Sequence, residues 1–249
     1  MELNKTFFLS GKTISNKPLE RPGTSAETFF FYMGILLISI VLLGFIPPVL
    51  SKPNGVFSLP LLYHLHGLAF VCWFGLFTLQ AYLVRDRSFR LHRLLGQSSI
   101  ALALAMLVTG YLMMRAAYAL PDFSIGSNGH VASMMFPATD LINFSIVYVL
   151  GLLNRGTPPA HKRLMLLAGI LILDPAVARL IQTIDAPFAL IPIVELALFA
   201  LLIGYDFLTL RKPHWCSLLG LALFFAAMAA KLSVAQTQAW ENIAQIVFG

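Results

Sequence analysis

Charge and cysteine are scarce in this sequence of 249 residues. Only 11% of its residues are charged and 58% are hydrophobic, whereas a typical soluble domain is about 25% charged. One soluble domain of this length has too little interior to hide so much apolar surface, and an intrinsically disordered chain needs the opposite composition. The presence of only two cysteines excludes a disulfide scaffold and a multi-cysteine metal site. The composition therefore indicates a membrane protein.

Long apolar runs account for most of the chain. A membrane-spanning helix needs about 20 mostly apolar residues, and seven runs qualify: 29–49, 61–84, 94–114, 134–153, 164–184, 188–208 and 214–234. None alternates polar and apolar residues as the strands of a membrane barrel do, so each run is predicted to be helical. We predict an all-α bundle of seven transmembrane helices over 29–235. A polar tail, 1–28, precedes it and a short external segment, 236–249, follows it.

The basic residues indicate how such a bundle is oriented. With seven spans, 13 of the 17 Lys and Arg residues fall on the side of the N-terminus. Because cytoplasmic loops carry the excess of Lys and Arg, the N-terminus is predicted to be cytoplasmic and the C-terminus external. The net charge of +6 then reports topology and predicts no nucleic-acid partner. We expect a multi-pass protein of a bacterial inner membrane, with the lipid bilayer as its main partner.

Ionisable side chains inside the apolar runs are the first candidate site, because such groups are costly in the hydrocarbon core and usually face a partner or a cavity. Helix rise puts His66, Asp140, Arg179 and Glu195 about 7–10 Å from the predicted external ends of four helices. The predicted polar cavity comprises His64, His66, Asp140, Asn143, Asp174, Arg179, Gln182 and Glu195. The alternative is a structural ion pair of Arg179 with Glu195 or Asp140. Lys231, near an external end, is expected to extend to the membrane surface.

Histidines form a second pattern, because three predicted helices begin at or just after His92, His161 and His214 on the cytoplasmic side. Helix N-termini favour anions, so one interpretation is contact with lipid phosphates. A second is axial ligation of haem b by His92 and His161, with His66 and His130 as an external candidate pair. A third is a transition-metal site, such as zinc, held by His92, His161 and His214.

Several short motifs can be taken together. They are His64-x-His66 with Trp73 and Gln80, Leu91-His92-Arg93-x-x-Gly96, His161-Lys162-Arg163-x-Met165, and Asp206 followed by Arg211-x-x-His214. Over roughly 61–220, this set resembles a group of uncharacterised bacterial polytopic membrane proteins. More distantly, the helix starts are similar to membrane factors that help to mature haem–copper oxidases, and to b-type cytochromes. The near resemblance implies no activity, and the distant one implies haem or copper handling.

Three functions are compatible with these patterns. The leading hypothesis is a haem- or metal-binding accessory protein that serves respiratory electron transfer or oxidase assembly, with a respiratory-chain protein as partner. The second is a small-solute or proton-coupled transporter that uses the polar cavity, with Asp174 as a relay near the midplane. The third is an intramembrane zinc hydrolase that uses three histidines and an aspartate. No catalytic residue is predicted.

Overall fold

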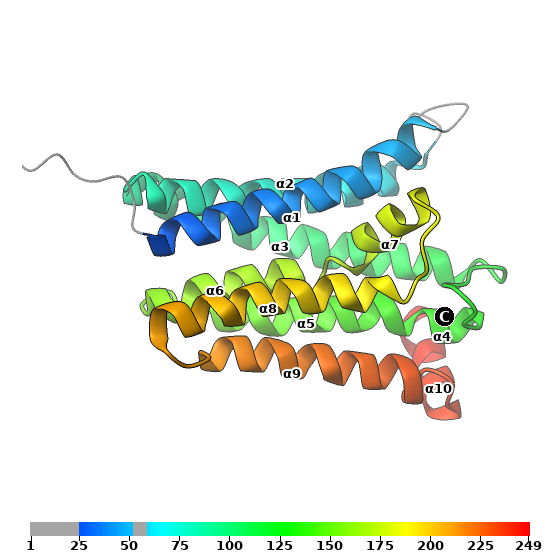
Figure 1. The fold of residues 1–249 in the computed structure, drawn as a ribbon. Helices are drawn as coiled ribbons and strands as arrows, with labels where there is room; N and C mark the ends of the chain where they lie inside the picture. The colour runs from blue at the N-terminus through cyan, green and yellow to red at the C-terminus, as the bar shows by residue number, and fades with distance from the viewer. Residues whose placement is uncertain (1–24, 52–58) are drawn as a thin grey trace, which may run out of the picture.

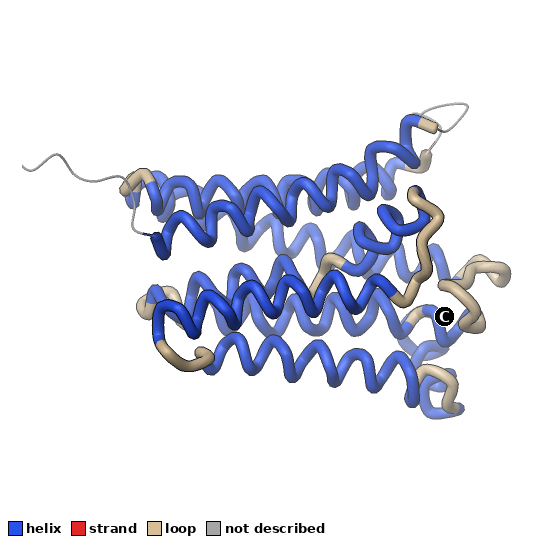
Figure 2. The backbone as a smooth tube through the Cα atoms, viewed as in Figure 1, coloured by secondary structure: helices blue, strands red, loops and turns tan. Residues whose placement is uncertain are grey.

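Helices are the regular elements of the computed structural model, which describes residues 25–51 and 59–249 (Figure 1). They are α1 (Ser25–Leu50), α2 (Leu61–Arg85), α3 (Phe89–Tyr118), α4 (His130–Ser133), α5 (Met135–Leu153), α6 (Pro158–Ile170), α7 (Asp174–Thr183), α8 (Leu190–Leu210), α9 (Trp215–Ala229), the π-helix η2 (Ala230–Val234) and α10 (Gln238–Phe248). The long helices run side by side, joined by short loops (Figure 2). We call the end of the bundle where α1 begins the α1 end, and the opposite end the α10 end.

Helix α6 is the centre of the bundle. It packs against α1, α2, α5 and α9, and its side chains Leu164, Leu166, Leu167 and Ile170 are fully buried. The residues 164–170 are apolar on every face of the helix, which suits this central position. The outer faces of α2, α3 and α8 instead carry exposed large apolar side chains, as expected of helices that face lipid.

The predicted span 164–184 is broken in the structure. Helix α6 ends at Ile170, α7 begins at Asp174, and the two axes meet at 44°. Pro175 explains part of the break, because proline has no N–H to continue the hydrogen-bond ladder and its ring clashes with the preceding turn. The break therefore puts Asp174 at the first residue of a new half-helix inside the bundle.

The end of the chain is more structured than the sequence suggested. Helix α9 passes into η2, a wide turn marked by the i to i−5 hydrogen bond from Ala235 N to Ala230 O at 3.0 Å. Helix α10 follows and packs against α3 and α4. Trp240 Nε1 donates to Val131 O at 2.8 Å. The segment predicted as a short tail is thus a helix that covers the α10 end.

Six helical segments of the described residues are long and apolar enough to cross a membrane, and the bent pair α6–α7 makes a seventh if it counts as one span. The prediction of an all-helical fold is confirmed for these residues, and their capacity to cross a membrane rests on helix length and composition. The predicted tail 1–28 lies almost wholly outside the described residues.

Candidate functional site

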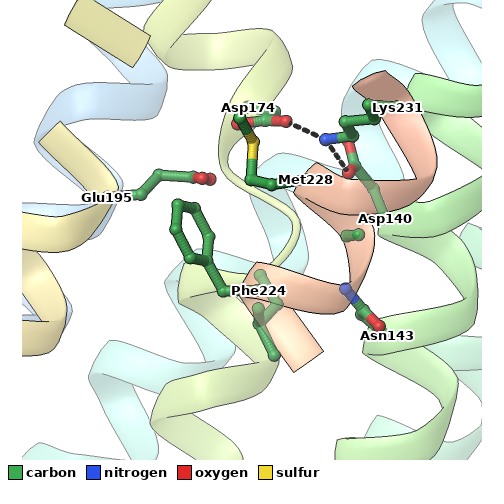
Figure 3. Close-up of a pocket in the computed structure, with 9 residues that line it drawn as sticks. Asp140, Asn143, Asp174, Glu195, Phe224, Met228 and Lys231 are labelled. Atoms are coloured by element: carbon green, nitrogen blue, oxygen red, sulfur yellow. Dashed lines mark hydrogen bonds and ion pairs between the residues drawn. The ribbon is translucent and has the colours of Figure 1, made fainter. Parts of the chain in front are cut away.

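Lys231 is the centre of a buried charge cluster near the α10 end (Figure 3). Its Nζ donates to Asp140 Oδ1 at 3.1 Å and to Asp174 Oδ2 at 2.5 Å. The side chains of Lys231 and Asp140 are only 6% and 7% exposed, and that of Asp174 is 17% exposed. One ammonium group therefore joins α5, the start of α7 and η2 inside the bundle.

A third carboxyl group faces these three. Glu195 of α8 is 5% exposed, and its side chain points into the cavity that Asp174 also lines (Figure 3). The cavity therefore brings three carboxyl groups and one ammonium group together. We call Asp140, Asp174, Glu195 and Lys231 the Lys231 cluster.

The Lys231 cluster lines a small, partly open cavity of about 10 Å³, which is room for about one water molecule. Asn143, which donates to Leu223 O at 3.4 Å, adds a polar wall. The remaining walls are apolar: Leu171, Phe224, Ala227 and Met228. The charged groups therefore meet in a confined space with one apolar wall.

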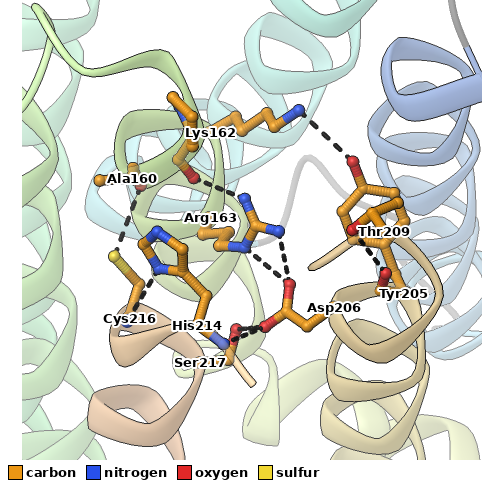
Figure 4. Close-up of polar contacts among 10 residues, drawn as sticks. Ala160, Lys162, Arg163, Tyr205, Asp206, Thr209, His214, Cys216 and Ser217 are labelled. Carbon is orange, nitrogen blue, oxygen red and sulfur yellow. Dashed lines mark hydrogen bonds and ion pairs between the residues drawn. The ribbon is translucent and has the colours of Figure 1, made fainter. Parts of the chain in front are cut away.

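A second buried charge cluster lies near the α1 end (Figure 4). Arg163 is 1% exposed and Asp206 is fully buried. Arg163 Nε donates to Asp206 Oδ1 at 2.8 Å, and Nη2 donates to the same oxygen at 2.5 Å. The other oxygen, Oδ2, accepts from Ser217 Oγ at 2.6 Å and from the backbone N of His214 at 2.9 Å. We call Arg163, Asp206 and Ser217 the Arg163 cluster.

The Arg163 cluster ties three helices together. Arg163 lies on α6 and Asp206 on α8, while Ser217 lies on α9. Arg163 Nη1 also donates to Pro159 O at 2.8 Å, and the neighbouring Lys162 Nζ donates to Tyr205 Oη at 3.4 Å. One cation faces one anion here, and both carboxylate oxygens of Asp206 accept hydrogen bonds. The charges and hydrogen bonds of the cluster are therefore balanced within the bundle.

His214 has a structural role beside this cluster. Its ring Nδ1 accepts from the backbone N of Cys216 at 3.2 Å and so caps α9. Burial lowers the pKa of His214, and the nearby guanidinium of Arg163 lowers it further. A neutral ring is the form that can accept this hydrogen bond through Nδ1.

The structure brings together part of the predicted polar cavity. Asp140, Asn143, Asp174 and Glu195 line the same cavity. The other four predicted residues, His64, His66, Arg179 and Gln182, do not line it. The alternative pairing of Arg179 with Glu195 or Asp140 is wrong. Arg179 Nη1 donates to Pro175 O at 3.2 Å, and its guanidinium lies 4.6 Å from the centre of the Phe45 ring.

Three of the remaining residues have local contacts outside the cavity or are exposed. His64 Nε2 lies 3.2 Å from Leu59 O, and the His66 ring packs 4.4 Å from the Phe70 ring. Gln182 is exposed at the end of α7. These positions lie outside the cavity, and His66 Nδ1 is buried there without a hydrogen-bond partner among the described residues.

Lys231 is the residue that sequence reasoning placed wrongly. Its position near the end of an apolar run predicted a side chain extending to the membrane surface. The structure buries it instead, because η2 and the following α10 continue the fold beyond it. Arg163 was likewise counted as a surface basic residue, although it is one of the largest fully buried side chains. For the burial of both residues, the signal in the sequence was a carboxylate within a predicted span that had no cation assigned to it.

The predicted histidine sites are not assembled as metal centres. Over residues 25–51 and 59–249, no three His, Cys, Asp or Glu side chains are grouped to hold a metal ion. This finding disfavours the three-histidine site, since His214 caps α9 while His161 Nδ1 lies 2.8 Å from Gly151 O. His66 packs on Phe70 and His130 packs on Tyr118, so the contacts of this second pair do not overlap.

Comparison of the chain with protein-family models, with curated proteins and with solved structures found no match.

Proposed function

We propose that the protein is an integral membrane carrier that binds and releases protons at the Lys231 cluster. The observation that carries this proposal is the charge imbalance. The buried Asp140 and Glu195 and the partly buried Asp174 line one cavity with a single ammonium group, so the cluster carries a net charge of −2 if all four are ionised. Burying unpaired charge costs several kcal/mol per ion in a real protein interior. Two bound protons make the cluster neutral.

Protons are the neutralising species that this donor set favours. The residues that the structure describes contain no metal-binding group of three His, Cys, Asp or Glu side chains. Neighbouring carboxyl groups that line one cavity, as Glu195 and Asp174 do, repel each other when both are ionised, and this repulsion favours a bound proton. Glu195 has no Lys or Arg partner at salt-bridge distance among the described residues. Glu195 is therefore the group we assign as the main proton carrier.

The helix geometry around the Lys231 cluster also supports a carrier. Asp174 begins a half-helix at a break in a membrane span, and discontinuous helices of this kind form substrate and ion sites in many transporters. Lys231 lies in a π-helix, an element that is frequent at functional sites. Both features allow local backbone rearrangement where the charged groups meet.

The proposal extends to topology. If α6 and α7 form one span, the chain crosses the membrane seven times. The excess of Lys and Arg at the α1 end then makes that end cytoplasmic. The cavity would lie in the external half of a bacterial inner membrane, while the Arg163 cluster would close the cytoplasmic side.

Infrared difference spectroscopy tests the proton-binding step without a known solute. The purified protein is titrated with acid and base, and the C=O stretching bands of protonated carboxyl groups are followed. We expect a band from a buried protonated carboxyl group that disappears in Glu195→Gln. Glu241→Gln removes an exposed glutamate of α10 and is the matched control, which should keep the band.

Proton movement is then measured in proteoliposomes with an entrapped pH-sensitive dye and an imposed potassium diffusion potential. Wild-type protein and Glu241→Gln should acidify or alkalise the lumen faster than empty vesicles do, and Glu195→Gln should match empty vesicles. The proposal fails if the wild-type spectrum contains no buried protonated carboxyl group. It also fails if Glu195→Gln moves protons as fast as the control.

A haem-binding role at the α1 end is the second candidate, and one observation favours it. His161 Nδ1 faces the carbonyl oxygen of Gly151 at 2.8 Å. Since a carbonyl only accepts, Nδ1 is the protonated nitrogen and Nε2 keeps its lone pair. Ligating histidines are commonly oriented in this way. Bound haem would supply electron transfer, with His92 as the second ligand. A visible absorption spectrum without a Soret band would end this candidate.

A further inference from the structure

Unpartnered polar atoms gather on a second interface, between α2, α3 and α5, away from the Lys231 cluster. Seven buried side-chain nitrogen and oxygen atoms of the described residues have no hydrogen-bond partner within the protein. Four of the seven belong to this interface: Trp73 Nε1, both amide atoms of Gln80, and His92 Nδ1. Because folded proteins leave few such atoms unsatisfied, their concentration here needs a physical explanation.

These residues form one continuous tract. On α2, Trp73 and Gln80 are seven residues apart and so lie on the same helix face. On α3, His92, Gly96 and Ser99 share a face in the same way. The two faces meet, because a side-chain carbon at Gly96 would lie 3.9 Å from Gln80 Nε2.

Helix α5 completes the tract. Ser99 Oγ lies 2.9 Å from Tyr148 Oη, and the Tyr148 ring lies 5.4 Å from the Trp73 ring. Helix rise puts Ser99 about 10 Å further into the bundle than His92. Trp73 is near the middle of α2. The tract therefore runs from the α1 end to the middle of the bundle.

The tract contains the kinds of polar group that bind water. Its groups are neutral donors and acceptors: an indole N–H, an amide, an imidazole and two hydroxyl groups. Leaving a buried donor or acceptor unsatisfied costs about 1–3 kcal/mol. Buried waters typically make about three hydrogen bonds to such groups. Gly96, Ser99 and Ala103 add little side-chain volume along the α3 face.

Aromatic rings end the tract. Phe144 is fully buried. Its ring lies 5.0 Å from that of Trp73 and 5.6 Å from that of Tyr148. The preceding residue, Asn143, lines the cavity of the Lys231 cluster. Phe144 and Trp73 thus separate the polar tract from that cavity.

We propose that the interface of α2, α3 and α5 holds a chain of ordered water that enters at His92 and ends at Trp73 and Phe144. The water satisfies Gln80 and Trp73 and is open to one side of the membrane only. This inference does not depend on proton binding at the Lys231 cluster. If both hold, the bundle has two polar compartments, one from each face, with two aromatic rings between them.

Cysteine accessibility tests this compartment in the full-length protein. In a Cys72→Ala, Cys216→Ala background, single cysteines are placed at Ser99 and, as the matched control, at Ser98. The two serines are adjacent on α3 and at nearly the same depth, but Ser98 is exposed toward the lipid-facing surface. A membrane-impermeant charged methanethiosulfonate is added to one side of the vesicles at a time. The reagent needs a thiolate, which forms only where the thiol meets water.

We expect Ser99→Cys to react at least about tenfold faster than Ser98→Cys. We expect it to react only from the side on which α3 begins. Gly96→Cys, a second variant nearer the entrance, should react from the same side and faster. Labelling after denaturation checks that every cysteine is present and free.

Three results would overturn the inference. Equal rates for Ser99→Cys and Ser98→Cys would mean that the interface is dry. Reaction of Ser99→Cys from both sides would mean that Phe144 and Trp73 do not close the tract. A Soret band in protein whose Ser99→Cys variant is unreactive would mean that haem occupies the space near His92. None of these results bears on the Glu195→Gln spectra, so the two proposals fail separately.

Discussion

The two buried charge clusters both combine one basic side chain with carboxyl groups, but they differ in how completely the charges are paired. In the Arg163 cluster, one guanidinium faces one carboxylate, and Ser217 and a backbone N–H satisfy the second oxygen. In the Lys231 cluster, one ammonium group serves two carboxylates, and a third carboxyl group has no cation at salt-bridge distance in the described structure. A buried ion pair is stable when its geometry and hydrogen bonds are complete. A cluster in which every charge has a partner suits a permanent connection between helices. A cluster with an unpaired carboxyl group suits a site that binds and releases protons.

Asp206→Asn should have the largest effect on stability. Arg163 cannot lose its proton, so the variant leaves a buried guanidinium without its anion. We expect a loss of about 3–5 kcal/mol in the free energy of unfolding, measured by denaturant unfolding in mixed micelles. Asp122→Asn, in an exposed loop, is the control and should change little. The double change Arg163→Met with Asp206→Leu removes both charges and should recover much of the loss. A loss below about 1 kcal/mol for Asp206→Asn would show the pair to be unimportant.

Gly44→Ala should come next and should affect the Lys231 cluster selectively. A side-chain carbon at Gly44 would clash with the backbone O of Ala176, where α1 crosses α7. The backbone of α7 must move, which carries Asp174 away from Lys231. Overpacking of this kind costs about 1–3 kcal/mol, and we expect the infrared band of the protonated carboxyl group to shift. Gly67→Ala on α2 is the control, because nothing lies within 4 Å of its added carbon. An unshifted band in Gly44→Ala would show that the position of α7 does not affect the Lys231 cluster.

Asp140→Asn should have a smaller effect than Asp206→Asn, although both remove a buried carboxylate. Lys231 keeps Asp174 as its partner, so no cation is left alone. One charge-assisted hydrogen bond is lost and repulsion among the carboxylates is relieved. We therefore expect a loss of about 1–2 kcal/mol by the same unfolding measurement. A loss as large as that of Asp206→Asn would show that the two clusters do not differ in the way described.

Glu195→Gln should have the smallest effect on stability and the largest on proton binding. No salt bridge is lost, because Glu195 makes none in the described structure. The change in unfolding free energy should stay below about 1 kcal/mol, of either sign, while proton movement in proteoliposomes is lost. A strongly destabilised Glu195→Gln would instead assign this carboxyl group a structural role.

The sequence predicts more of the fold than of the site. Apolar runs and loop residues were enough to place the long helices, because lipid forces each span to satisfy its own hydrogen bonds. Depth along a helix grouped Asp140 and Glu195, which line the same cavity. Depth gives no rotation about the helix axis, however. Arg179 shared the predicted layer but turns to Phe45 and Pro175.

Pairing between distant residues was beyond the sequence. Arg163 and Asp206 are 43 residues apart, and Lys231 and Asp140 are 91 apart. Such pairs depend on which helices are neighbours, and short loops between similar apolar helices leave that open. Lys231 was missed for a further reason, since a π-helix followed by a covering helix cannot be read from an apolar run.

The π-helix η2 makes the charged cavity sensitive to the number of residues in this segment as well as to their identity. A π-turn contains one residue more than the α-turn it replaces. Deleting a single codon in 230–234 restores an ordinary helix and rotates whatever lies beyond the deletion by about 100°. Lys231 and α10 can then no longer both keep their positions in the bundle. In lineages related to this chain, a one-residue gap at this place would mark proteins with the same membrane fold and a different interior.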